Sequence, residues 1–368
     1  TAFFVSEMPL IGPLANIVVV PLMSAVVIPT AMIGHFCVLF NSAVGGLFLL
    51  IADYVLHLVI TFLEMLVVAK PVTLAGISWS GLFLSGVLAV FCLLPISLRY
   101  RLLAISGWSL VVGKLPSMPE WLHFRVYTLD VGQGSAAIID TARHRLVFDT
   151  GPAFPSGFNA GSEIVLPALR ATGPYQLDRI VVSHADIDHS GGLSALRQEF
   201  PRTPQVSQDD CTHKDQWVWE GVSFQLLKDV SSRTRNSGSC TLLIQSISAS
   251  AYLSGDIERE SELFIKNFIP KDLDFMTAPH HGSRTSSHPA FVKKLRPEAV
   301  VFSAGFQNRY GHPATEVVAR YHRRGAKIVW TYSSGAVLWE SRGKQLTTYR
   351  NILLGNYLPI VRSLDGND

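Results

Sequence analysis

Long apolar runs fill the first part of the chain. The three longest are Leu14–Phe40, Val44–Val68 and Gly81–Leu98. Each is long enough to cross roughly 30 Å of hydrocarbon as an α-helix. Pro21 and Pro29 lie inside the first run and predict a kinked or broken helix there. A further run, Leu102–Val112, is marginal for a span. The pattern predicts an α-helical transmembrane bundle over residues 1–115.

Charge is nearly absent from this region. Between Thr1 and Leu98 the charged residues are only Glu7, Asp53, Glu64 and Lys70, which excludes an ordinary soluble domain. The spacing of Asp53, His57 and Glu64 places them on one face of a helix. That face is either a polar surface buried between helices or the lining of a pathway, because ionisable groups in lipid often mark function.

The start of the chain and the cations after the third run bear on its placement. The chain begins with Thr1 and shows no translation start or signal peptide, so we expect a piece of a longer protein. Arg99 and Arg101 are expected in the cytoplasm by the positive-inside rule. If Leu102–Val112 crosses back, the rest of the chain lies outside the cytoplasm; if it lies on the membrane surface, the rest lies inside.

Beyond the apolar region, short strand-like runs alternate with turns. We expect a linker with two prolines at 116–123, a domain at 124–352 and a tail at 353–368. The expected strands are Phe124–Val131, Ala136–Asp140, Arg145–Phe148, Arg179–Val182, Gly221–Leu227, Thr241–Ile247, Ala251–Leu253, Phe275–Ala278, Ala299–Ser303, Lys327–Thr331 and Ala336–Trp339. The expected helices are Glu163–Thr172, Gly191–Phe200, Glu258–Asn267, Pro289–Leu295 and Thr315–Arg324. This order favours a layered sandwich with helices outside.

The densest cluster of potential metal ligands follows the expected strand Arg179–Val182. It contains His184, Asp186, Asp188 and His189 within six residues, followed by Gly191 and Gly192. Two imidazoles and two carboxylates at a strand end can converge on one or two divalent cations. The glycines permit a tight turn into the next helix.

Two later strands also end in side chains of the ligand type. Asp256 follows the strand Ala251–Leu253, and the pair His280-His281 follows Phe275–Ala278. We expect Asp256 to bridge two metals and His281, with His280 as the alternative, to complete the set. Such a centre activates water and stabilises the leaving oxygen of a phosphodiester. Asp188 is then expected to orient the attacking water, and no covalent protein intermediate is needed.

These motifs resemble a known family. The run from His184 to His189 is similar to the metal signature of the metallo-β-lactamase superfamily with its second histidine replaced by Asp186. The ordered set resembles the ComEC family of DNA-uptake proteins and covers the whole second part of the chain. Its motifs are Leu129–Gly134, Phe148–Gly151, Ser254–Glu258, Pro279–Ser283 and Tyr310–Pro313, together with Gly12–Asn16 in the apolar part.

The resemblance implies a fold, a location and an activity. The fold is the αββα sandwich of the metallo-β-lactamase superfamily, and the location is the bacterial inner membrane. The implied role is the uptake of transforming DNA, in which one strand passes the membrane and the hydrolase domain degrades the other. The amino-terminal part of such a protein, with its small DNA-binding domain, is missing from this chain, and other uptake proteins are candidate partners.

The chain departs from the superfamily at three positions. Asp186 replaces a histidine, Ser135 stands where many relatives have Asp, and Asn236 and Ser239 occupy the region of the usual third-motif histidine. The centre is therefore expected to be rich in oxygen, which favours Mn²⁺ or Mg²⁺, with Zn²⁺ as an alternative. His312 is a candidate contact to the phosphate or leaving group. The candidate substrate-binding residues are Asn236, Ser239, Ser283, Arg284 and Arg309.

Charge changes sign along this second part. Residues 121–283 carry 14 basic and 19 acidic side chains, a net charge of −5, whereas residues 284–344 carry 11 basic and 3 acidic ones, a net charge of +8. A basic stretch suits a polyanionic substrate because cations bind phosphates. The cluster Arg320–Lys327 can equally be a solvated helix face. Trp217 and Trp219 are interpreted as core residues rather than as a base-stacking surface.

Two cysteines, Cys211 and Cys240, lie in the second part of the chain. They flank two strands that are expected to pair, so a disulfide between them is predicted; two buried free thiols are the alternative. A disulfide would place the domain outside the cytoplasm. Two other functions stay open beside the nuclease: a membrane-anchored lactonase or esterase, and a DNA-binding domain without catalysis.

Overall fold

The computed structural model describes residues 7–8, 11–67, 72–73, 97–111, 117–232 and 234–349, with scattered positions between 84 and 94. The chain divides into two compact units, Thr1–Leu115 and Pro116–Asp368, and each is considered by itself. The expected tail, 353–368, lies outside the described residues.

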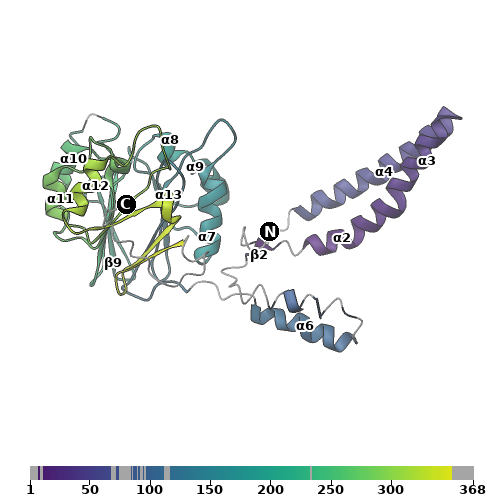
Figure 1. Cartoon of the computed structure of the whole chain (residues 1–368), viewed down its shortest axis with the longest axis horizontal. Helices are drawn as coiled ribbons and strands as arrows, with labels where there is room; N and C mark the ends of the chain where they lie inside the picture. Colours follow the sequence, from purple (N-terminus) through teal and green to yellow (C-terminus); the bar gives the residue numbers. More distant parts are fainter. Residues whose placement is uncertain are drawn as a thin grey trace, which may run out of the picture. The chain divides into compact units, whose positions relative to one another are not determined.

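A helical hairpin makes up most of the described part of the first unit (Figure 1). Its elements are α2 (Ile11–Leu22), the π-helix η1 (Met23–Val27), α3 (Ile28–Val38) and α4 (Ser42–Val67), with the strand pair β1 (Glu7–Met8) and β2 (Val72–Thr73). The stretches Ala15–Val38 and Ser42–Leu66 are long and apolar enough to cross a membrane. The π-helical segment lies between Pro21 and Pro29, so the first helix is interrupted where the prolines predict it.

Two glycines allow α3 and α4 to approach closely. A Cβ on Gly45 would lie 2.5 Å from the backbone nitrogen of Val38 and 2.8 Å from the carbonyl oxygen of Gly34. A larger residue at Gly45 would therefore separate the two helices. Asp53, His57 and Glu64 are exposed in the described hairpin, so α3 does not cover the polar face of α4.

The third apolar run falls largely outside the described residues. Helix α6 (Leu98–Val111) begins before the shorter run and includes Arg99 and Arg101. These cations therefore lie in the first turn of a helix, and their place in the cytoplasm stays a prediction.

Two seven-stranded sheets form the second unit. In the first sheet the order is β14 (Lys327–Trp330), β13 (Ala299–Phe302), β12 (Phe275–Thr277), β11 (Ser250–Leu253), β10 (Thr241–Gln245), β9 (Val222–Leu227) and β8 (Gln216–Trp219). In the second it is β16 (Gln345–Thr348), β15 (Val337–Glu340), β3 (Arg125–Thr128), β4 (Ala136–Asp140), β5 (Arg145–Thr150), β6 (Arg179–Val181) and β7 (Gln205–Val206).

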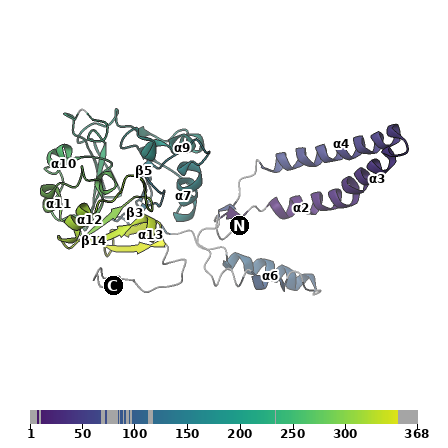
Figure 2. The ribbon, with the colours of Figure 1, turned by 45° about the horizontal axis from the view of Figure 1, so that its top comes forward.

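Helices cover the outer faces of both sheets (Figures 1 and 2). On the first sheet lie α10 (Arg259–Ile265), α11 (Pro289–Leu295) and α12 (Thr315–His322). On the second lie the π-helix η2 (Gly161–Val165), α7 (Leu166–Thr172) and α9 (Leu193–Glu199). Three short elements complete the unit: α8 (Ile187–Ser190), the 3₁₀ turn η3 (Pro279–Gly282) and α13 (Thr331–Ser334). The expected αββα sandwich is confirmed.

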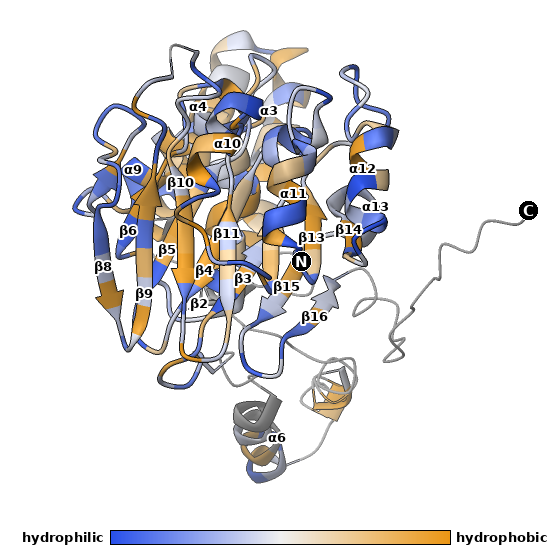
Figure 3. Cartoon of the chain, turned by 90° about the vertical axis from the view of Figure 1, so that its left-hand side faces the viewer, coloured by the Kyte–Doolittle hydropathy of each residue, from blue (hydrophilic) through white to orange (hydrophobic). Residues whose placement is uncertain are grey.

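The central strands of the first sheet are rich in apolar residues, as Figure 3 shows by colour, and are buried on both faces. In β10, Leu242 and Ile244 pack between the sheets, whereas Leu243 packs under the outer helices. This double burial explains the continuous apolar run at 242–244, because neighbouring side chains of a strand point to opposite faces. Strand β8, missed by sequence analysis, lies at the edge, where Trp217 and Trp219 pack against the inner core as expected.

Parallel pairing determines where the ligand-bearing loops emerge. Strand β5 runs parallel to β6, and β11, β12 and β13 run parallel to one another. Parallel strands end at the same edge of their sheet. The loops that follow β6, β11 and β12 carry the candidate ligands, and their side chains meet between the ends of the two sheets.

Candidate metal centre

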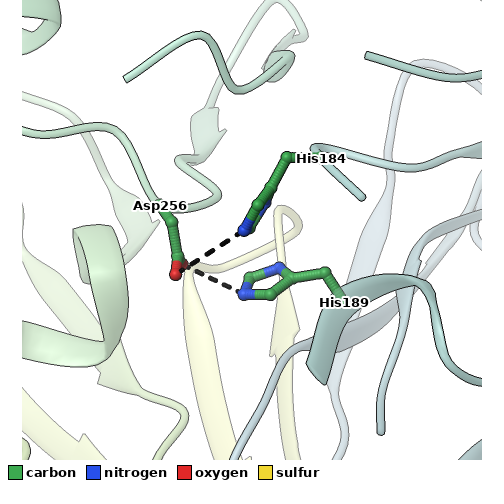
Figure 4. Close-up of side chains that lie close together, drawn as sticks. All are labelled: His184, His189 and Asp256. Atoms are coloured by element: carbon green, nitrogen blue, oxygen red, sulfur yellow. Dashed lines mark ion pairs between the residues drawn. The ribbon is translucent and has the colours of Figure 1, made fainter. Parts of the chain in front are cut away.

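Asp256 lies at the centre of the ligand cluster. One of its oxygens, Oδ1, is 3.1 Å from His189 Nε2 and 3.5 Å from His281 Nε2. The other, Oδ2, is 3.9 Å from His184 Nε2 and 3.6 Å from His280 Nε2. Figure 4 shows the imidazoles of His184 and His189 directed at the carboxylate. The carboxylate thus faces imidazoles from two loops on each side, as a bridging ligand would.

Two of these imidazoles are oriented by acceptors on their outer nitrogens. His189 Nδ1 is 2.7 Å from Asp149 Oδ2, and His281 Nδ1 is 2.7 Å from the carbonyl oxygen of Ser303. Both partners can only accept, so each Nδ1 carries the proton and, in the neutral ring, each Nε2 presents a lone pair. The two Nε2 atoms lie 3.2 Å apart. Two lone pairs at that distance repel unless a proton or a metal cation lies between or beside them.

The same reasoning holds for the third imidazole. The Ser183 hydroxyl donates to Asp149 Oδ2 and therefore accepts from His184 Nδ1, 3.0 Å away. His184 Nε2 then also points its lone pair inward. This atom is buried without a hydrogen-bond partner, and so is Asp256 Oδ1. Buried polar atoms left unpaired are costly, which a divalent cation bound to them would relieve. The residues therefore fit the divalent metal that the fold implies.

The remaining candidate ligands surround this buried core at its rim. Asp188 Oδ2 is 3.4 Å from His281 Nε2, and Asp186 Oδ2 is 3.5 Å from His184 Nε2. Both carboxylates are partly exposed, as is His280. His280 Nε2 also accepts from the side-chain amide of Asn236 at 3.4 Å. His281 is the buried member of the histidine pair.

Electrostatics in the centre favour a positive charge. Burial opposes a charge on His189, but the carboxylates of Asp256 and Asp149 raise the pKa of its imidazole well above the ordinary value. Burial also opposes ionisation of Asp256, yet His189 and His281 hold the pKa of its carboxyl well below the usual range. Burial and the neighbouring His189 lower the pKa of His184. An anionic Asp256 among imidazoles is what a cation site requires.

Two glycines allow the segment 182–192 after β6, called the His-Asp loop here, to lie against strand β5. A Cβ on Gly191 would come within 2.2 Å of the Ala153 nitrogen, and one on Gly192 within 2.2 Å of the Thr150 carbonyl oxygen. Any side chain at either position would push the loop away from β5, where Asp149 orients His189. The glycines predicted to permit a turn therefore serve mainly as a close-packing surface.

Three orienting residues were missed by sequence analysis. Asp149 accepts from the Ser183 backbone nitrogen and hydroxyl and from His189, although its own backbone is left-handed, with φ of 57°. Arg235 Nη1 donates to Asp186 Oδ1 at 2.6 Å. Asp149 lies within a motif of the family resemblance, which could have indicated its role. Ser183 and Arg235 carried no such signal, because their contacts depend on the tertiary fold.

The predicted substrate-binding residues divide into two groups. Asn236 contacts His280, and Ser239 donates to the Asn236 carbonyl oxygen at 2.6 Å, so both lie beside the centre. Ser283 lies two residues beyond His281 and contacts Thr285. In contrast, Arg284 is exposed and pairs with Glu316, and Arg309 packs over the ring of Tyr310. In the described structure both arginines contact surface partners, and their role in binding the substrate stays a prediction.

His312 lies beside the histidine pair of the loop after β12. Its ring is 5.6 Å from that of His280 and 6.4 Å from that of His281. Its Nδ1 is buried without a partner. Burial, together with the two neighbouring histidines, lowers the pKa of its imidazole to about 4.

Cys211 and Cys240 are joined as a disulfide, with their Cα atoms 5.9 Å apart. The Cys240 nitrogen donates to the carbonyl oxygen of Ser183, the residue before His184. The disulfide is thus attached to the strand end that carries the His-Asp loop.

Comparison with known proteins identifies both parts of the chain. Residues 1–101 match the family described as competence protein, and residues 129–224 match the metallo-beta-lactamase superfamily. Among solved structures, a metallo-hydrolase of the archaeon Ignicoccus hospitalis is 16% identical with a TM-score of 0.42, covering 58% of this chain and 98% of that protein.

Curated relatives extend over most of the chain. Competence protein ComA of Neisseria gonorrhoeae is 30% identical over 346 residues, which cover 91% of this chain and 48% of that protein. Recombination protein 2 of Haemophilus influenzae is 32% identical over 242 residues, 62% of this chain and 30% of that protein. The chain spans about half or less of the length of these relatives. Residues 1–101 therefore match the competence protein family, and residues 129–224 match the metallo-beta-lactamase superfamily within the same chain.

Proposed function

We propose that this chain is the part of a DNA-uptake protein that hydrolyses phosphodiester bonds, and that it degrades the strand that is not transported. The observation that carries the proposal is the convergence of the inward Nε2 atoms of His184, His189 and His281 on the buried carboxylate of Asp256. The candidate cation centre, the metallo-beta-lactamase domain that carries it and the competence segment in the same chain together support the proposal.

The proposed ligands are His184, Asp186, Asp188, His189, Asp256 and His281, with His280 at the rim. Bound there, one or two divalent ions would supply Lewis acidity, lower the pKa of a water molecule and neutralise phosphate charge. Asp188, which is partly exposed, is the proposed residue that would orient the attacking water as well as bind metal. His312, with an unpartnered Nδ1, is the proposed contact to the phosphate or the leaving oxygen. The rim carboxylates favour Mn²⁺ or Mg²⁺, whereas the three imidazoles also suit Zn²⁺.

The substrate is assigned from the relatives and from charge. Two relatives are a competence protein and a recombination protein, whose names concern DNA. The net charge of +8 over residues 284–344 suits a polyanion. Part of this charge has internal partners, since Arg296 pairs with Asp272 and Arg320 donates to backbone carbonyls. A lactone or ester substrate lacks the phosphate charge that such a surface would bind.

The location of the domain follows from the disulfide. A disulfide forms and persists in oxidising compartments. We therefore assign residues 1–115 to a multi-pass segment of the bacterial inner membrane and the hydrolase domain, 124–352 after a linker at 116–123, to the outer side of that membrane. DNA, membrane lipid, the amino-terminal part of the same protein and other uptake proteins are the expected partners.

A substrate panel tests the proposed activity. The full chain, purified in detergent, is incubated with end-labelled single- and double-stranded DNA, with a chromogenic lactone and with an ester, each with Mn²⁺, Mg²⁺ or Zn²⁺. We expect cleavage of DNA with at least one metal, and EDTA should stop it. Hydrolysis of the lactone with intact DNA would instead support the esterase alternative. Retention of DNA without cleavage under every metal would support a non-catalytic binding domain.

A further inference from the structure

Arg235 is bound to one of the proposed metal ligands. It lies in the segment 228–240, which connects β9 to β10 and is called the arginine loop here. Its Nη1 donates to Asp186 Oδ1 at 2.6 Å, while Asp186 Oδ2 faces His184 Nε2 at 3.5 Å. One oxygen of the Asp186 carboxylate thus accepts from the guanidinium, and the other faces the unpartnered Nε2 of His184.

The arginine loop is fastened at Arg235 and at its carboxy-terminal end. The side-chain amide of Gln208 donates to the Arg235 carbonyl oxygen at 2.6 Å. At the end of the loop, Cys240 forms the disulfide with Cys211 and donates its backbone N–H to the Ser183 carbonyl oxygen at 2.8 Å. Gln208 and Cys211 belong to the same short segment after β7. The position of the guanidinium is therefore set by residues distant in sequence from the metal motif.

Stability alone does not account for this ion pair. The Arg235 side chain is 63% exposed and that of Asp186 is 34% exposed. Ion pairs at such exposure typically contribute little to folding, because solvent screens the charges. A carboxylate on a loop, however, rotates freely unless one oxygen is fixed, and residues that fix metal ligands strongly affect metal affinity. A charge-assisted hydrogen bond at this distance is suited to that task.

We propose that Arg235 is a positioning residue, which holds Asp186 with its second oxygen toward the metal bound by His184, and that the Cys211–Cys240 disulfide keeps Arg235 in place. The inference rests on the proposed function, because it requires Asp186 to be a metal ligand. It adds that the affinity of the centre depends on a residue and a disulfide outside the metal motifs.

Metal affinity, measured without DNA, is the direct test. Mn²⁺ binding to the full chain in detergent is followed by electron paramagnetic resonance for the wild type, Arg235→Ala and Arg235→Lys. The matched control is Arg296→Ala. Arg296 is another exposed arginine, and it pairs with Asp272, which lies shortly before β12. We expect Arg235→Ala to weaken binding by about 10–100-fold, as loss of an orienting partner does. Arg235→Lys should restore part of it, and Arg296→Ala should bind as the wild type does.

Thermal melting separates positioning from folding, since Arg235→Ala should melt with the wild type. Unchanged Mn²⁺ binding by Arg235→Ala would overturn the inference. Tighter binding would also overturn it, because it would mean that the arginine competes with the metal. DNA cleavage by the same samples distinguishes the two proposals. A wild type that binds Mn²⁺ in an Arg235-dependent manner but leaves every DNA intact would overturn the nuclease function alone.

The disulfide is tested by combining it with the arginine change. The double variant Cys211→Ser/Cys240→Ser should bind Mn²⁺ more weakly than the wild type. If the disulfide acts through Arg235, the same cysteine changes made in Arg235→Ala should add little, because residues acting as one unit are not additive. Equal losses in both backgrounds would show that the disulfide acts independently and would overturn this part of the inference.

Discussion

The imidazole orientations follow from hydrogen bonds made by residues that never face the centre. Asp149 accepts from His189 Nδ1 at 2.7 Å and from the Ser183 hydroxyl at 3.0 Å, and that hydroxyl in turn accepts from His184. One buried carboxylate therefore determines which nitrogen of two rings is free to bind a cation. These hydrogen bonds matter for metal binding as well as for folding. A site cannot bind its metal when a ligand nitrogen presents a proton instead of a lone pair.

Replacing Asp149 by Asn should weaken metal binding with little change in volume. The amide can donate to His189 Nδ1, which would move the ring proton to Nε2 and block the inward lone pair. We expect the affinity for Mn²⁺ or Zn²⁺, measured by isothermal titration calorimetry, to fall by about 10–100-fold. The matched control is Asp274→Asn, which removes a carboxylate that accepts from a backbone N–H at the opposite strand end. Wild-type affinity in Asp149→Asn would refute the orienting role.

Much of the site was predictable from sequence, whereas its supporting contacts were not. His184, Asp188, Asp256 and His281 each follow or adjoin an apolar strand, so their convergence could be anticipated from the common edge of parallel strands. Arg235 lies in a polar loop, and its partner Asp186 is 49 residues away. No local pattern encodes a contact of that kind.

At the scale of elements, strands buried on both faces were found, as was the edge strand β14, whereas the edge strands β7, β8 and β16 were missed. The run at 242–244 is continuously apolar because β10 packs against two layers. In contrast, β8 and β16 lie at sheet edges and mix polar and apolar residues, so the sequence offered only a weak signal. The short helix α8 was also missed, because its four residues are mainly polar ligands and carry no helical period.

Helix α10 carries a buried carboxylate that should make stability depend on pH. Glu262 accepts from the backbone nitrogens of Ser287 and His288 at 2.5 and 2.6 Å, at the start of α11. Burial raises the pKa of Glu262 from 4.5 to about 7, although these two bonds oppose the rise. The folded protein therefore binds this proton more tightly than the unfolded chain does. The resulting stabilisation is present in acid and is lost as pH rises through about 7.

A Glu262→Gln variant tests this linkage. Between about pH 5 and pH 7.5 we expect the wild type to lose thermal stability relative to Glu262→Gln, because only the wild type must ionise the buried group. Differential scanning calorimetry across this range measures the difference in Tm. Glu260→Gln, an exposed change on the same helix, is the control and should track the wild type. A difference in Tm that stays constant with pH would refute the linkage.

For the whole molecule, the disulfide determines the proposed side of the membrane. Free thiols are first labelled with a maleimide in native membranes. The protein is then reduced, and the thiols that become reactive are counted. The variant Cys211→Ser/Cys240→Ser gives the reference value for the remaining cysteines. We expect Cys211 and Cys240 to react only after reduction, since the bridge should form outside the cytoplasm. Two thiols that react before any reduction would contradict the disulfide in the cell and remove this argument for export.

The proposed function depends on Asp256, whose two carboxylate oxygens each face imidazoles. The most direct measurement is the rate of cleavage of end-labelled DNA by the full chain with Mn²⁺, compared with Asp256→Ala and with wild type in EDTA. We expect cleavage by the wild type and its loss, by at least about 100-fold, in the other two samples, because Asp256 is the proposed ligand that would help to hold the metal. Cleavage by Asp256→Ala at the wild-type rate would contradict the proposed function.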